Sequence, residues 1–95
     1  MISDYLIGEL SVRLEQLEAG APGAARDVAR LRYQVESGPL AGLASAAVHA
    51  LAMADDLCWD SLSRGDVAGF ARQARVSSDL RLFAVCARLL ADDEG

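Results

Sequence analysis

A run of residues without a formal charge, from Ser37 to Ala54, most constrains what this chain can fold into. The run is rich in alanine and offers water few groups to solvate, so we expect it to lie in the central helix of a small bundle. Gly38 and Pro39 break the chain near its start, and proline suits the first position of a helix. We therefore predict a long helix from Pro39 to Gly65, packed closely through its alanines.

The composition favours a single all-α domain. The chain has 95 residues, which is enough for one hydrophobic core but not for two. Hydrophobic residues make up 53% of the chain, much of that fraction is alanine, and aromatic residues make up only 5%, so residues that favour strands are scarce. We predict one helical domain over residues 1–91, followed by a disordered acidic tail over residues 92–95.

Three further helices are predicted around the long one. The first covers residues 3–19, where apolar residues recur at spacings of three and four, and it ends at the glycines and proline of residues 20–23. The second covers residues 24–37, and one kinked helix running through the break is the alternative. The fourth covers residues 67–91. It follows a turn at Gly65–Asp66, in which the glycine ends one helix and the aspartate caps the next.

These elements predict a four-helix, bundle-like domain that dimerisation completes. Its core is a long antiparallel hairpin of the third and fourth helices about Gly65, with the shorter hairpin of the first and second helices laid against it. At 1.5 Å per residue, Cys58 and Cys86 then lie about 20 Å apart along the hairpin. This separation is too large for a disulfide, so we expect two free thiols.

The fourth helix carries apolar residues on two nearly opposite sides. We expect the first stripe to face the third helix, with Leu82 and Val85 alongside Val48 and Ala44. This first stripe consists of Val67, Phe70, Ala71, Ala74, Ser78, Leu82, Val85 and Leu89. A helix at the edge of a four-helix monomer buries one apolar face, so the second stripe indicates that the fourth helix is central or that it meets another subunit. We predict the second, a homodimer interface.

The predicted interface combines the second stripe and its flanks with one residue of the third helix. Its members are Val76, Leu80, Phe83, Cys86, Leu90 and Trp59. A break at residues 77–79, where serine and aspartate can cap a fresh helix, is the alternative that reconciles the two stripes.

Charge and the lack of targeting signals argue against several partners. The net charge is −5 and no basic face is contiguous, so phosphate backbones would repel the chain and we expect no nucleic-acid partner. No basic start precedes an apolar run, and the uncharged run is short for a bilayer, so we expect no membrane association and a cytoplasmic location. Lysine, asparagine and threonine are absent, a bias that indicates a GC-rich bacterial genome.

The sharpest candidate for chemistry lies on the third helix. His49, Asp56 and Asp60 fall seven and four residues apart on one side, and imidazole and carboxylate groups coordinate divalent metals. With Glu15 and Glu18 they suggest a metal-dependent hydrolase, which is the alternative hypothesis. Because no catalytic motif is assembled, the sequence favours a non-enzymatic protein-interaction module without a cofactor. We expect a small regulator or adaptor that forms a homodimer and binds an unidentified protein.

Overall fold

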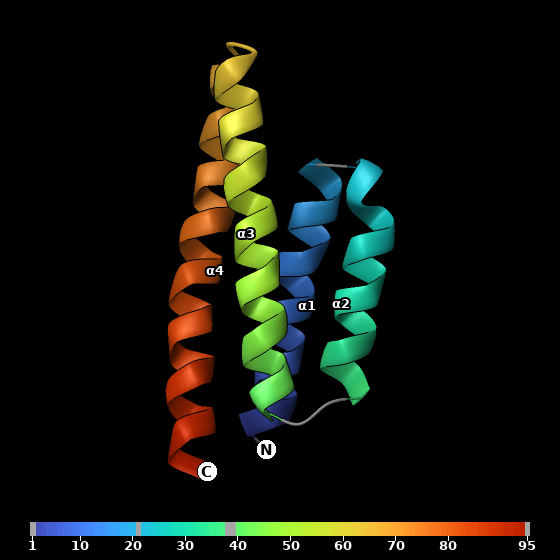
Figure 1. Ribbon diagram of the computed structural model, residues 1–95, viewed down its shortest axis with the longest axis vertical. Helices are drawn as coiled ribbons and strands as arrows, with labels where there is room; N and C mark the ends of the chain where they lie inside the picture. Colours follow the sequence, from blue (N-terminus) through green and yellow to red (C-terminus); the bar gives the residue numbers. More distant parts are fainter. Residues whose placement is uncertain (1, 21, 38–39, 95) are drawn as a thin grey trace.

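The computed structural model describes residues 2–20, 22–37 and 40–94 of the chain. The elements are α1 (Ile2–Gly20), the 3₁₀-helix η1 (Pro22–Ala24), α2 (Ala25–Ser37), α3 (Leu40–Ser63) and α4 (Val67–Glu94) (Figure 1). The described residues contain four α-helices and no strand, which confirms the predicted all-α fold.

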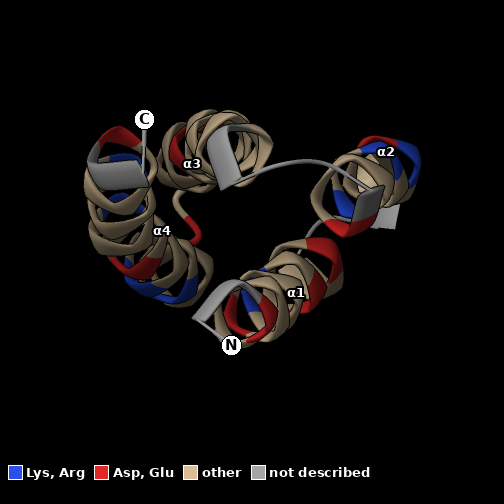
Figure 2. Cartoon of the chain, turned by 90° about the horizontal axis from the view of Figure 1, so that it is seen from below, with Lys and Arg blue, Asp and Glu red and all other residues tan. Residues whose placement is uncertain are grey.

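The helices form two antiparallel hairpins of unequal length. α3 and α4 make the long hairpin and pack most closely, while α1 and α2 make the shorter one beside it (Figure 1). α2 returns antiparallel to α1, so the alternative of one kinked helix is wrong. Seen along the helix axes, the four helices follow one another in the order α4, α3, α2, α1 (Figure 2). The molecule measures 44 × 23 × 16 Å, because the long hairpin extends past the short one at its turn.

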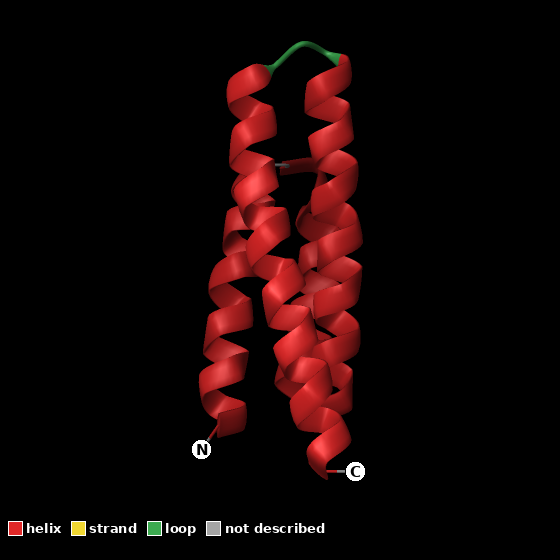
Figure 3. Cartoon of the chain, turned by 90° about the vertical axis from the view of Figure 1, so that its left-hand side faces the viewer, coloured by secondary structure: helices red, strands yellow, loops and turns green. Residues whose placement is uncertain are grey.

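The turn between α3 and α4 has the geometry that the sequence predicts. Gly65 has a φ of 73°, in the left-handed region that glycine adopts without steric cost. The amide of Asp66 donates to the carbonyl of Ser61 and the amide of Gly65 donates to the carbonyl of Leu62, the two bonds of a Schellman motif. The carboxylate of Asp66 accepts a bond of 2.9 Å from the amide of Gly69 and thereby caps α4. Figure 3 shows this short loop at the end of the hairpin.

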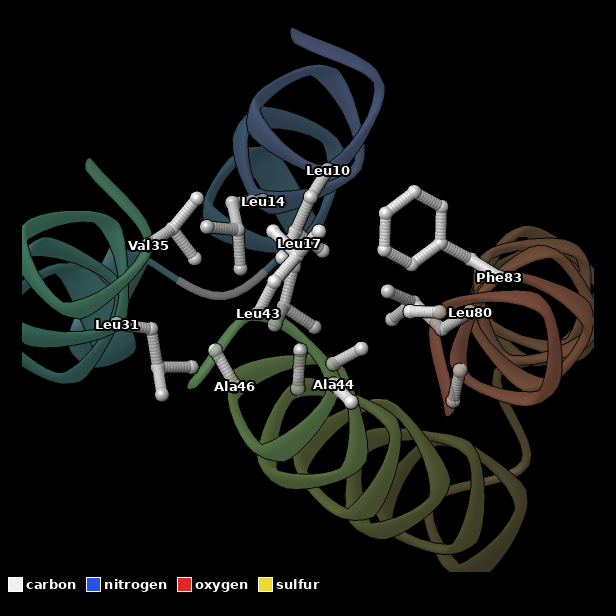
Figure 4. Packing of buried hydrophobic residues seen from close by; sticks show 14 of the residues in the cluster. Leu10, Leu14, Leu17, Leu31, Val35, Leu43, Ala44, Ala46, Leu80 and Phe83 are labelled. Atoms are coloured by element: carbon white, nitrogen blue, oxygen red, sulfur yellow. The ribbon is translucent and has the colours of Figure 1, made fainter. Parts of the chain in front are cut away.

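The core lies where α1, α2 and α4 meet the alanine-rich face of α3. Ala46, Ala47, Ala50 and Ala54 are completely buried, which confirms that the uncharged run lies in a central helix packed through its alanines. Larger side chains from the neighbouring helices fill the space against these alanines (Figure 4). They are Leu6, Leu10, Leu14, Leu17, Val28, Leu31, Val35, Leu80 and Phe83.

The helix bounds follow the predicted elements with two differences, both in α4. This helix is continuous from residue 67 to residue 94, so the alternative break at residues 77–79 is wrong. The same helix includes residues 92–94, where the sequence predicts a disordered tail; Gly95 and the predicted break at Gly38–Pro39 lie outside the described residues. Each acidic residue at a helix C-terminus opposes the helix dipole by only about 0.3–1 kcal/mol, which is too little to end a helix.

Candidate functional site

The two apolar stripes of α4 lie the other way round from the sequence prediction. Leu80 is 0% exposed and Phe83 is buried, both within the core of their own chain. Val76 and Leu90 are partly buried against the same core. Of the six residues predicted as a dimer interface, Leu80 and Phe83 are therefore not available to a second copy of this folded chain, and Val76 and Leu90 are available only in part.

The short hairpin is the reason for this reversal. Figure 4 shows Leu80 and Phe83 projecting from α4 toward Leu10 and Leu17 of α1. The guanidinium carbon of Arg13, also in α1, lies 5.5 Å from the centroid of the Phe83 ring, a cation–π geometry. The second stripe thus has its partner inside the chain, in the hairpin that α1 and α2 form.

The stripe predicted to face α3 lies instead on the outer side of α4, where Figures 2 and 3 show no other helix over it. Leu82 is 69% exposed and Val85 is 54% exposed, and Val67 and Leu89 are also exposed. We call this surface the outer stripe, and it consists of Val67, Ala71, Ala74, Ser78, Leu82, Val85 and Leu89. Its seven members are uncharged, and the exposed Arg75 and Arg81 lie on its two flanks, where they line the grooves beside it.

α3 contributes exposed apolar residues beside the outer stripe. Val48, Trp59 and Leu62 are exposed, Trp59 by 68%, and their spacing places them along one side of α3. A surface groove of about 360 Å³ runs between these exposed residues of α3 and α4. It is lined by Val48, Leu51, Arg81, Ala84, Val85, Arg88 and Leu89. Together, the outer stripe and these three exposed residues of α3 form what we call the hairpin face.

A polar contact fixes how α3 and α4 are aligned along the hairpin. Ser77, which is buried, donates a short hydrogen bond from its hydroxyl to the carboxylate of Asp55. Arg81 places a guanidinium nitrogen 3.5 Å from the other oxygen of Asp55. The sequence predicts Val48 beside Leu82 and Ala44 beside Val85, whereas in the structure Val48 lines a groove with Val85, about one helical turn further along α4. The expected burial of Leu82 in that contact does not occur.

The remaining members of the predicted interface stay on the surface. Trp59 belongs to the hairpin face, and Cys86 is exposed on α4. Both Cys58 and Cys86 are free thiols, as predicted. Burial, with a smaller contribution from the charge of Asp55, raises the pKa of the Cys58 thiol. A raised pKa lowers the fraction of reactive thiolate.

The three candidate metal ligands do not form a cluster. His49, Asp56 and Asp60 lie on the exposed side of α3, and Asp60 pairs with Arg64 at 3.0 Å. His49 and Asp56 are separated by about 10 Å along the helix, whereas metal–ligand bonds are about 2–2.6 Å long. Within residues 2–20, 22–37 and 40–94, no group of three His, Cys, Asp or Glu side chains is placed to hold a metal ion, Glu15 and Glu18 included.

A second groove, of about 560 Å³, lies between the end of α1 and the side of α4. Arg72, Arg75 and Asp79 line it together with Gly20 and Gln73. Among the described residues, none of these three charged side chains makes an ion pair. These charges border the outer stripe on the side of α4 that faces α1.

Comparison with known families, curated proteins and solved structures found no match for this chain. Within the described residues, no helix combines the length and the apolar character needed to cross a membrane.

Proposed function

We propose that this chain is a non-enzymatic protein-interaction module of the bacterial cytoplasm, a regulator or adaptor that acts as a homodimer through its hairpin face. The single observation that supports this proposal is the uncharged outer stripe, which stays exposed along most of α4. Isolated exposed hydrophobic residues are ordinary on a monomer, but contiguous apolar patches mark interaction sites.

The energetics favour a dimer that buries the whole hairpin face over one that buries the outer stripe alone. Fully burying a Val or Leu side chain contributes about 1.5–3 kcal/mol, so covering the exposed parts of Val67, Leu82, Val85 and Leu89 contributes about 4–8 kcal/mol from each copy, or about 8–16 kcal/mol for the dimer. Association costs an estimated 4–15 kcal/mol in lost freedom of motion. Because these two ranges overlap, burial of the exposed residues of α3 adds to the stability of the dimer, and Trp59 offers the largest side chain among them.

The matched substitutions Val85→Glu and Val12→Glu test this proposal. Val85 is 54% exposed within the hairpin face, and Val12 is 51% exposed on α1, outside it. Both changes introduce the same charge at the same residue type and exposure. We expect sedimentation equilibrium to show dimers for the original chain and for Val12→Glu, but monomers for Val85→Glu with unchanged helical circular dichroism. A monomeric original chain, or a Val85→Glu variant that dimerises as well as Val12→Glu, would contradict the proposal.

A further inference from the structure

We infer that the second copy covers the hairpin face in an antiparallel arrangement, with a two-fold axis that crosses α4 at Ser78 and α3 at Asp55. This inference rests on the proposed homodimer and specifies which residues of the two copies meet. It follows from three features of the hairpin face: the order of large and small residues, the alignment of α3 with α4, and the unpaired charges beside the outer stripe.

The outer stripe is self-complementary about Ser78. Ala74 and Leu82 each lie four residues from Ser78, and Ala71 and Val85 each lie seven residues from it. An antiparallel two-fold places residues that are equally distant from the axis opposite each other. Leu82 of each copy then faces Ala74 of the other, and Val85 faces Ala71, so that large side chains fill the space beside small ones. A parallel arrangement would instead set Leu82 against Leu82 and leave Ala71 facing Ala71.

The same axis fits α3 without further adjustment. Because Ser77 bonds to Asp55, Asp55 lies level with Ser78 along the hairpin. On α3, Val48 and Leu62 each lie seven residues from Asp55 and face each other across the axis, and Trp59 faces Leu51 in the other copy.

The charge of Asp55 near the axis is already balanced within each chain. Its carboxylate accepts the hydroxyl hydrogen bond of Ser77 and lies 3.5 Å from a guanidinium nitrogen of Arg81. Two carboxylates close to a symmetry axis would otherwise repel each other.

The charges beside the outer stripe complement one another in this arrangement. Arg75 and Asp79 lie on the same flank of α4, three residues before and one residue after Ser78, and neither makes an ion pair within the described part of the chain. The two-fold brings Arg75 of each copy next to Asp79 of the other. It therefore forms two symmetric pairs of opposite charge at the edge of an apolar contact, where charges fix the register.

The size of the hairpin face agrees with a dimer of this kind. From Val67 to Leu89 the face is about 33 Å long, at 1.5 Å per residue, and two helices of about 10 Å each give a width of about 20 Å. The projected area of about 660 Å² is close to the roughly 800 Å² per partner of a stable interface.

Cysteine cross-linking tests the axis directly. In a background carrying Cys58→Ser and Cys86→Ala, the variant Ser78→Cys places a thiol on the axis in both copies. We expect oxidation, or a short bismaleimide, to convert this variant to a covalent dimer. The variants Ala71→Cys and Val85→Cys should cross-link when mixed with each other but not alone, because each thiol then lies about 21 Å from its own counterpart.

The outcomes of this experiment distinguish failure of the antiparallel arrangement from failure of the proposed homodimer. If Val85→Cys cross-links alone, the copies are parallel and the inference is wrong. If sedimentation shows a dimer but Ser78→Cys does not cross-link, the axis is wrong while the homodimer stands. If the original chain is a monomer, both fail.

Charge reversal gives a second readout of the register. We expect Arg75→Asp and Asp79→Arg each to weaken dimerisation about tenfold, and the double variant to restore it. A double variant that remains as weak as the single variants would overturn the pairing.

Discussion

Leu80 and Leu82 are two residues apart on α4, yet the structure assigns them opposite roles. Leu80 is completely buried in the core, whereas Leu82 is 69% exposed in the outer stripe. The sequence pattern predicts the reverse, with Leu82 in the contact with α3 and Leu80 at an interface. Replacing each by alanine therefore measures which side of α4 faces the core. The chemical change is the same at both positions.

The two substitutions should differ by several kcal/mol in the free energy of unfolding. A fully buried leucine replaced by alanine costs about 2–5 kcal/mol, because apolar burial is lost and a cavity remains. A domain of this length is stable by about 5–14 kcal/mol, so Leu80→Ala removes a large part of its stability. Leu82→Ala should change stability by less than about 0.5 kcal/mol, since alanine also favours the helix slightly. A loss of about 3 kcal/mol corresponds to a fall in Tm of about 12–24 °C.

Urea and thermal unfolding followed by circular dichroism are the measurements. Both substitutions are made in the Val85→Glu background, so that burial of Leu82 between two copies does not enter the comparison. Similar losses for both variants, or a larger loss for Leu82→Ala, would refute the assignment of the two faces of α4.

Three further predictions concern the turn between α3 and α4 and the thiols. Gly65→Ala should lower the free energy of unfolding by about 1–2 kcal/mol in urea titrations, because alanine resists the φ of 73°; an unchanged midpoint would contradict this. Because burial and then Asp55 raise the pKa of Cys58, this thiol should react with iodoacetamide more slowly than the exposed Cys86 at pH 8, as read by mass spectrometry. The raised pKa also means that unfolded chains ionise Cys58 first, so stability should fall as the pH rises above about 9.0.

Much of the fold follows from local signals in the chain. The Gly65–Asp66 turn is predictable because glycine supplies a left-handed backbone and aspartate supplies a cap, and both appear in the structure. The central position of α3 is predictable because an uncharged, alanine-rich segment such as Ala46–Ala54 gains nothing from exposure to water. Counting 1.5 Å per residue from the turn places Val48 beside Leu82, within about one helical turn of Val85, with which it lines a groove in the structure.

The candidate site was harder to predict than the fold. Periodicity shows that α4 has two apolar sides, but both have similar residues, and nothing local marks Phe83 as inner and Leu82 as outer. Which side of α4 faces the core depends on where α1 lies, and α1 is more than fifty residues away from Leu82 and Phe83 in the sequence. For the same reason, His49 and Asp60 share a side of α3 without forming a site, because among the described residues the other helices complete no group of three possible ligands around them.

The order of residues along the chain thus determined the helices, their breaks and the antiparallel register of α3 and α4, because each of these depends on backbone preferences and on distances along one helix. Only the tertiary structure decided which side of α4 is covered. That choice depends on the packing of α1 against Leu80 and Phe83, and it leaves the uncharged outer stripe exposed to water. The physical reason is that two apolar stripes of similar composition have similar free energies of burial, so the geometry of the other helices selects between them.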